Sequence, residues 1–217
     1  MAARDYGQYC GVTRALELVG ERWALLIVRD LLVGPRRYGD LAAGLPRIPS
    51  NILAARLKEL QAAGVIRRVP RSRVIVYELT PYGRELEPVV LALGAWGFKA
   101  MGEPRDEQVI TPDSMTMALR TAFRPQVAAN LPATAYAGRF DHASVHAELL
   151  IRVDGPTLDV TRGEAPADLS FVAGPGIRRL ISGELTPDGA IAAGVVEVLG
   201  GSRDLLGRFA STFHLAS

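Results

Sequence analysis

The apolar positions of the first hundred residues follow a helical period before they change to a strand period. Apolar residues spaced three and four apart predict helices over 12–19, 23–32, 37–44 and 51–63, and Gly64 follows the last of them. The second of these segments is almost entirely apolar, which is typical of a central buried helix. This half of the chain therefore begins as a small helical domain.

After Gly64 the period shortens to that of a strand. Two short apolar runs, 65–69 and 74–79, flank a turn at 70–73, which predicts a two-stranded hairpin. Thr80 then caps a further helix whose apolar stripe runs over 86–100. Two short helices joined by a tight turn and followed by a hairpin are the order of a winged helix-turn-helix.

The second half alternates between strand and helix patterns and predicts an α/β sheet domain, so that the chain as a whole is α+β. The expected strands are 133–141, 145–153, 157–162, 169–173 and 194–200. The expected helices are 113–131 (interrupted at Pro125), 174–184, a short helix capped by Thr186, and the closing amphipathic helix 202–214.

Length and composition are those of a soluble globular protein. The 217 residues allow one large domain or two small ones, and the 48% hydrophobic and 22% charged content excludes disorder, collagen and a coiled-coil rod. No apolar run approaches the ~18 residues of a membrane-spanning helix, and no signal core follows the N-terminus. The single cysteine fits a reducing compartment, so we expect a cytoplasmic protein that does not bind membranes.

The net charge of +2 is unevenly distributed. Residues 1–102 hold 15 basic and 9 acidic residues, a net charge of +6, whereas residues 103–217 hold 10 and 14, a net charge of −4. The sign changes at a polar segment, 102–107, that contains Gly and Pro. We therefore expect a winged helix-turn-helix domain at 1–102, a linker at 103–111 and a sheet domain at 112–217, with nucleic acid contacting the basic half.

The helix 51–63 has the face that reading DNA requires. On a helical wheel Leu53, Leu57 and Leu60 form the core stripe, and the outward positions are small or polar. No carboxylate lies at the N-terminal end of this outward face. The major groove needs close approach, hydrogen-bond donors and no anion, so the sequence predicts that this helix enters it as the recognition helix.

Arginines surround this helix in the preceding helix, the connecting turn and the hairpin tip. The predicted DNA contacts are Arg36, Arg37, Arg47, Ser50 (as the helix cap beside a phosphate), Asn51, Ala54, Ala55, Arg56, Lys58, Arg71 and Arg73. The alternative for each arginine is a solvated surface side chain.

Four segments in the same order resemble the HxlR-type winged helix-turn-helix regulators. They are 10–32, 34–41, 48–60 and 77–83, and the resemblance covers about residues 8–101. It implies a dimeric bacterial regulator that binds double-stranded DNA and dimerises through its terminal helices. The stripe 86–96 and the segment before Gly20 are the candidate interface, and packing on their own domain is the alternative.

Cys10 is a candidate redox sensor, because some members of this family sense oxidants through an N-terminal cysteine. Arg14, one helical turn further on, is the group expected to favour the thiolate. The alternative is a small residue buried at the dimer interface.

Residues 112–215 resemble the sterol-carrier-protein-like domain, through the segments 153–155, 158–164, 181–190, 194–201 and 206–213. The resemblance implies an apolar cavity for a hydrophobic small molecule. The candidate lining residues are Leu119, Phe123, Ile151, Phe171, Leu180, Leu185, Phe209 and Phe213. Ordinary core packing is the alternative role for each of them.

Enzymatic chemistry has little support in the sequence. His142 and His146 are four apart but lie across an expected turn, and there is no HExxH motif, phosphate loop or dinucleotide fingerprint. We therefore expect no metal, cofactor or catalytic residue. The rival functions are a hydrophobic-ligand carrier that uses the winged helix only to dimerise, and a methyltransferase, which the length and the absence of a cofactor motif disfavour.

Overall fold

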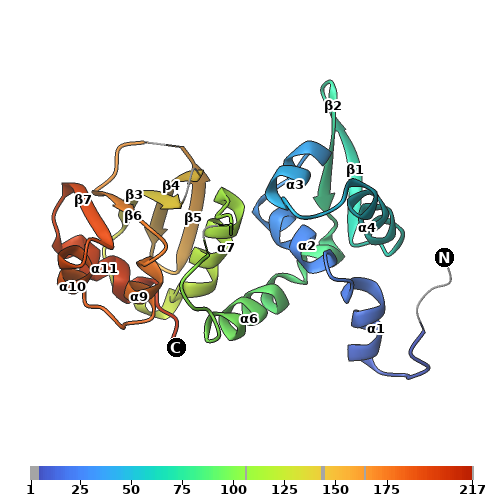
Figure 1. Cartoon of the computed structure of the whole chain (residues 1–217), viewed down its shortest axis with the longest axis horizontal. Coiled ribbons are helices and arrows are strands. Elements are labelled where there is room, and N and C mark those ends of the chain that lie inside the picture. The colour runs from blue at the N-terminus through green and yellow to red at the C-terminus, as the bar shows by residue number, and fades with distance from the viewer. Residues whose placement is uncertain (1–4, 106, 143–144, 164, 217) are drawn as a thin grey trace. The chain divides into compact units, whose positions relative to one another are not determined.

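The chain divides into two compact units, residues 1–90 and 91–217, in a computed structural model that describes residues 5–105, 107–142, 145–163 and 165–216 (Figure 1). The division falls inside helix α6 (Glu87–Phe98), upstream of the linker expected at 103–111. Among the described residues, no helix combines the length and apolar character that crossing a membrane would require.

The first unit contains the predicted helices. They are α1 (Gly11–Val19), α2 (Ala24–Val33), α3 (Tyr38–Gly44) and α4 (Ser50–Ala62). Helix α2 is buried along most of its length, as its continuous apolar sequence predicts. The core is completed by one leucine of α3 and three of α4, namely Leu41, Leu53, Leu57 and Leu60.

The hairpin is longer, and its turn tighter, than the sequence predicts. Strands β1 (Ile66–Arg71) and β2 (Val74–Leu79) pair antiparallel, with Arg71 opposite Val74, so the turn is the two residues between them. The first of these, Ser72, has a φ of 54°, as tight hairpin turns require. The expected turn 70–73 was therefore two residues too long at its N-terminal end, whereas β2 begins at Val74 as predicted. A two-stranded ribbon tolerates Pro70 because each strand is an edge.

One helix was predicted after the hairpin, but the structure has two: α5 (Pro81–Arg84) and α6. Thr80 caps α5 as expected, since its side chain accepts a hydrogen bond from the Gly83 amide at 3.0 Å. Pro88 explains the break, because it has no N–H to donate to the carbonyl four residues before it and its ring crowds that carbonyl.

The second unit is a five-stranded sheet with helices packed on one face. The strands β3 (Thr134–His142), β4 (Val145–Asp154), β5 (Thr157–Arg162), β6 (Leu169–Ala173) and β7 (Val196–Gly201) lie in the order β5-β4-β3-β6-β7. All neighbours are antiparallel except β3 and β6. The helices are α7 (Pro112–Ala122), α8 (Pro125–Ala128), α9 (Ile177–Ile181), α10 (Pro187–Ala192) and α11 (Asp204–Thr212).

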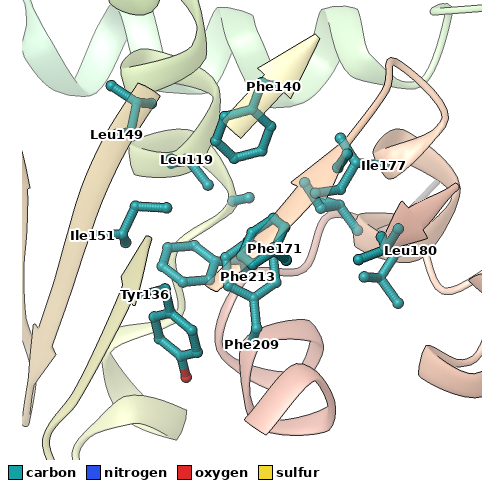
Figure 2. Packing of buried hydrophobic residues seen from close by; sticks show 14 of the residues in the cluster. Leu119, Tyr136, Phe140, Leu149, Ile151, Phe171, Ile177, Leu180, Phe209 and Phe213 are labelled. Atoms are coloured by element: carbon teal, nitrogen blue, oxygen red, sulfur yellow. The ribbon is translucent and has the colours of Figure 1, made fainter. Parts of the chain in front are cut away.

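Aromatic side chains fill the space between this sheet and its helices (Figure 2). The Phe209 ring lies 5.3 Å from the rings of Tyr136 and Phe171 and 4.7 Å from that of Phe213. Gly138 leaves room for the pair formed by Phe140 and Phe171, because a Cβ there would lie 2.9 Å from the Phe140 ring. The core of the second unit is therefore built around edge-to-face and tilted aromatic rings from the sheet, α11 and the residue that follows α11.

Candidate nucleic-acid interface

Helix α4 is the second of the two helices, α3 and α4, that form the helix-turn-helix, and it exposes one polar face. Leu53, Leu57 and Leu60 are buried as the wheel predicts, and Asn51, Ala54 and Lys58 are exposed. Ala55, expected on the outer face, is half-buried instead. The exposed face of α4 is therefore centred about one residue closer to Ala54 than the wheel predicts. It still consists of small side chains and hydrogen-bond donors.

The start of α4 differs from the prediction. Ser50 is the first residue of the helix and not its cap, because Pro49 takes the extended cap position with a φ of −63° and a ψ of 142°. The helix has no side-chain cap, and Ser50 is held through its carbonyl oxygen, which accepts a hydrogen bond from the Tyr38 hydroxyl at 2.9 Å. Tyr38 therefore joins the two helices of the motif, a role that its place in an apolar stripe did not reveal.

Several of the predicted basic residues are exposed around α4. Within the described part of the chain, Arg37, Arg47, Lys58 and Arg73 are exposed and form no ion pair. Arg36 is half-buried, and its backbone pairs with that of Tyr77 through hydrogen bonds of 3.0 and 2.7 Å. Arg36 thus ties the start of α3 to the hairpin, while the others face solvent.

Arg56 is the predicted contact that the structure places differently. Its side chain is 12% exposed, and its Nη1 lies 3.2 Å from Glu21 Oε2 and also pairs with Glu59. Arg56 therefore joins α4 to the segment that precedes α2. On the helical wheel Arg56 lies beside the core stripe. A wheel of one helix cannot show the carboxylate of Glu21, which belongs to a different segment of the chain.

The hairpin holds two arginines on one carboxylate. Arg67 Nη2 lies 2.7 Å from Glu78 Oε1, and Arg71 Nη2 lies 2.9 Å from Glu78 Oε2. The hydrogen bond from Arg67, with a further contribution from Arg71, lowers the pKa of Glu78 below its ordinary value. The sequence analysis included Arg71 but missed Arg67 and Glu78, which cross-strand register would have paired had the turn been placed correctly.

Arg68 occupies the other face of the hairpin, and the sequence analysis also missed it. Its guanidinium lies 5.9 Å from the centre of the Tyr77 ring. These two residues and α4 border an open hollow of about 460 Å³. It is lined by Tyr38, Ala54, Leu57, Lys58, Gln61, Ala62, Arg68 and Tyr77.

Cys10 is exposed and takes the cap position before α1. Hydrogen bonds from the backbone of Thr13 and Val12 lower the pKa of the Cys10 thiol. Arg14, expected to do this, instead pairs with Glu17 at 3.0 Å. The buried position considered for Cys10 is not seen in the single chain.

The residues expected to line a ligand cavity lie in the core of the second unit. Six are buried and two, Phe123 and Leu185, are partly buried against them. A separate hollow of about 380 Å³ includes only Phe171 of this set. Its other wall residues include Ala137, Arg139 and Glu148, which alternate with core positions and so belong to the opposite face of the sheet. The ligand-binding role of the eight residues stays a prediction.

Among the described residues, no three His, Cys, Asp or Glu side chains are grouped closely enough to hold a metal ion. His142 and His146 lie on the paired strands β3 and β4, and His146 Nδ1 is 2.8 Å from Asp141 Oδ1.

Residues 18–105 match the family model described as the HxlR-like helix-turn-helix. The uncharacterized HTH-type transcriptional regulator YvaP of Bacillus subtilis is 37% identical over 86 residues, which are 38% of this chain and 80% of YvaP. An uncharacterized HTH-type transcriptional regulator of Mycobacterium tuberculosis is 45% identical over 96 residues, 43% of this chain, and the chain spans only 60% of that relative's length.

The reduced form of the transcriptional regulator YodB from B. subtilis is a similar solved structure, 31% identical, with a TM-score of 0.38 over 45% of this chain and 100% of that chain. These matches all fall in the N-terminal part, and the likeness of 112–215 to a sterol-carrier domain stays a prediction. Because its N-terminal residues match both the family model and most of the length of a relative such as YvaP, the chain belongs to the HxlR-like helix-turn-helix family.

Proposed function

We propose that the protein is a DNA-binding transcriptional regulator whose helix α4 enters the major groove. The observation that carries the proposal is the outer face of α4, where Asn51, Ala54 and Lys58 are exposed while the leucines of the same helix are buried. Relatives named HTH-type transcriptional regulators support the same function.

The chemistry of this face suits base edges and phosphates. An Asn side chain can form two hydrogen bonds with adenine, and alanine lets the helix backbone approach closely. Arg37 is the N-cap residue of the helix before α4, and Arg47 and Arg73 lie in the connecting turn and at the hairpin tip. In these places they would neutralise phosphates. Binding should therefore weaken steeply as salt is raised.

A mobility-shift assay with DNA from upstream of the protein's own gene tests this function. The N51A/K58A variant should bind at least tenfold more weakly, because it loses one base contact and one cation. The matched control is R152A, which removes an exposed cation from the second unit and should bind as the wild type does. A flat salt dependence, or unchanged binding by N51A/K58A, would contradict the proposal and favour a ligand carrier.

We also propose that the regulator is a homodimer that uses its terminal helices. Helix α1 exposes Val12 and Leu16, and α6 exposes Val89, Leu93 and Trp96, the last at 75%. Large apolar side chains on one helix surface favour association with a partner surface. Sedimentation of a V12S/L16S variant tests the α1 contribution, and an unchanged dimer would remove α1 from the interface.

Control by a hydrophobic effector in the second unit is the finer part of the proposal. It is supported only by the likeness of this unit to sterol-carrier domains. A regulator of this kind needs the effector to favour one arrangement of its two recognition helices. Native mass spectrometry of the purified protein should show a co-purified small molecule, and a bare chain would count against this part.

Redox sensing by Cys10 is a second candidate function. It is supported by the exposed thiol and by its lowered pKa, since a reactive cysteine must be accessible and ionise readily. Diamide should release DNA from the wild type but not from the C10S variant. Equal release from both proteins would exclude this function.

A further inference from the structure

The two wing arginines at positions 67 and 71 share one carboxylate, and both of its oxygens are engaged. Arg67 holds Glu78 Oε1 through Nε at 2.8 Å and Nη2 at 2.7 Å, and Arg71 holds Oε2 at 2.9 Å. The Glu78 side chain is only 9% exposed, whereas those of Arg67 and Arg71 are 61% and 57% exposed. The carboxylate is therefore covered, and the arginines that cover it face solvent.

Strand register separates the wing arginines into two groups. Arg67 is paired with Glu78 across the hairpin, and Arg68 is paired with Tyr77. Because neighbouring residues of a strand point to opposite faces, Arg67 and Glu78 share one face and Arg68 and Tyr77 the other. The Arg68 face borders the hollow beside α4, so the carboxylate acts only on the opposite face.

We propose, building on the DNA-binding function above, that Glu78 is an internal counter-ion of the wing that sets how strongly the protein binds DNA irrespective of sequence. Glu78 cancels one of the two positive charges and fixes both guanidinium groups along the strand. Sequence-independent affinity comes from neutralised phosphates, so cancelling a cation lowers this affinity and leaves the contacts made by α4 unchanged. Glu78 is thus a positioning residue that raises specificity for the operator.

The test is a salt titration of binding to a mixed-sequence DNA duplex by the full-length E78Q variant. One additional phosphate contact should steepen the plot of log K against log salt by about 0.9 and tighten binding roughly fivefold to tenfold at 0.1 M salt. The matched control is E85Q, which removes an equal charge from an exposed residue after α5. E85Q should leave the slope as it is in the wild type.

A triple variant, R67Q/R71Q/E78Q, identifies the source of the effect. If the released arginines cause the steeper slope, the triple variant loses it and has a slope at or below that of the wild type. Circular dichroism establishes that each variant is folded, and if E78Q is not, E78D replaces it. Aspartate keeps the charge but is one methylene too short to reach both arginines, so the slope should change in the same direction by less.

The outcomes separate this inference from the function on which it rests. If the wild type binds the duplex and E78Q has the slope of E85Q, the counter-ion role is wrong and the DNA-binding function stands. If E78Q and the triple variant have the same steep slope, the arginines are not the source, and the inference is again overturned. If the wild type binds neither this duplex nor upstream DNA at any salt concentration, both proposals fall.

Discussion

Replacing Arg56 by glutamine should weaken the fold of the first unit and leave the electrostatics of DNA binding unchanged. The Arg56 guanidinium pairs with Glu21 at 3.2 Å and with Glu59, and its side chain is 12% exposed. A hydrogen bond to a charged group contributes ~1.5–3 kcal/mol, and we expect the lower half of this range because Glu59 is 40% exposed. At ~4–8 °C per kcal/mol for a unit of this size, the melting temperature should fall by roughly 6–18 °C.

Two measurements on R56Q check this reasoning. Thermal unfolding followed by circular dichroism gives the loss of stability, and a salt titration of DNA binding below the melting transition gives the number of phosphate contacts. The matched control is K58Q on the same helix, which should keep its melting temperature and lose about 0.9 from the salt slope. The reasoning would be refuted if R56Q melted as the wild type does and lost the same slope as K58Q.

Three further predictions concern the second unit. F209A should destabilise it by about 3–5 kcal/mol in a denaturant titration, because Phe209 is fully buried among three aromatic rings, whereas L199A at an exposed site should stay within about 0.5 kcal/mol. G201A should cost roughly 3 kcal/mol or more, since Gly201 has a φ of 91° and a Cβ there would lie 2.0 Å from the Asp168 carbonyl oxygen; G200A, with open space around it, is the control. Burial raises the pKa of Tyr136 from 10.0 to about 12, so the folded state holds this proton more tightly and stability should be full below pH 10 and decline toward pH 12. Y136F should flatten that decline in urea titrations across this pH range, and an equal decline in both proteins would contradict the assignment.

Local periodicity was sufficient to find almost every element of both units. The three leucines of α4 are spaced so that a helix places them on one side, and the alternation of polar and apolar residues in β5 is typical of a strand. The errors lie where a neighbouring element decides the geometry. Pro70 indicated a turn, but it is paired with Ile75 inside the ribbon. Serine is a residue type that often caps helices, but Pro49 occupies the N-cap position of α4 and Ser50 is the first helical residue.

The position of the boundary between the units depends on packing as well as on composition. The change of charge placed a boundary near residue 102, because charge patterns report which residues face solvent. The structure divides the chain inside α6, whose later residues pack with the second unit: a Cβ on Gly94 would lie 3.0 Å from the Thr121 hydroxyl, and Phe98 packs on the aromatic core. Packing of this kind depends on residues far apart in sequence, which composition does not record.

The sequence by itself determined the family, the order of the elements, the buried face of α4 and the presence of basic residues around it, because each of these follows from residue type and local spacing. Only the tertiary structure decided which of the basic residues are held by a carboxylate and which face solvent without one. Arg56 meets Glu21 from 35 positions away, and Arg67 and Arg71 meet Glu78 across the hairpin. Ion pairs depend on helix packing and strand register, because these bring together side chains that are distant in sequence. The sequence shows where the charged residues are, but only the tertiary structure shows which of them are paired.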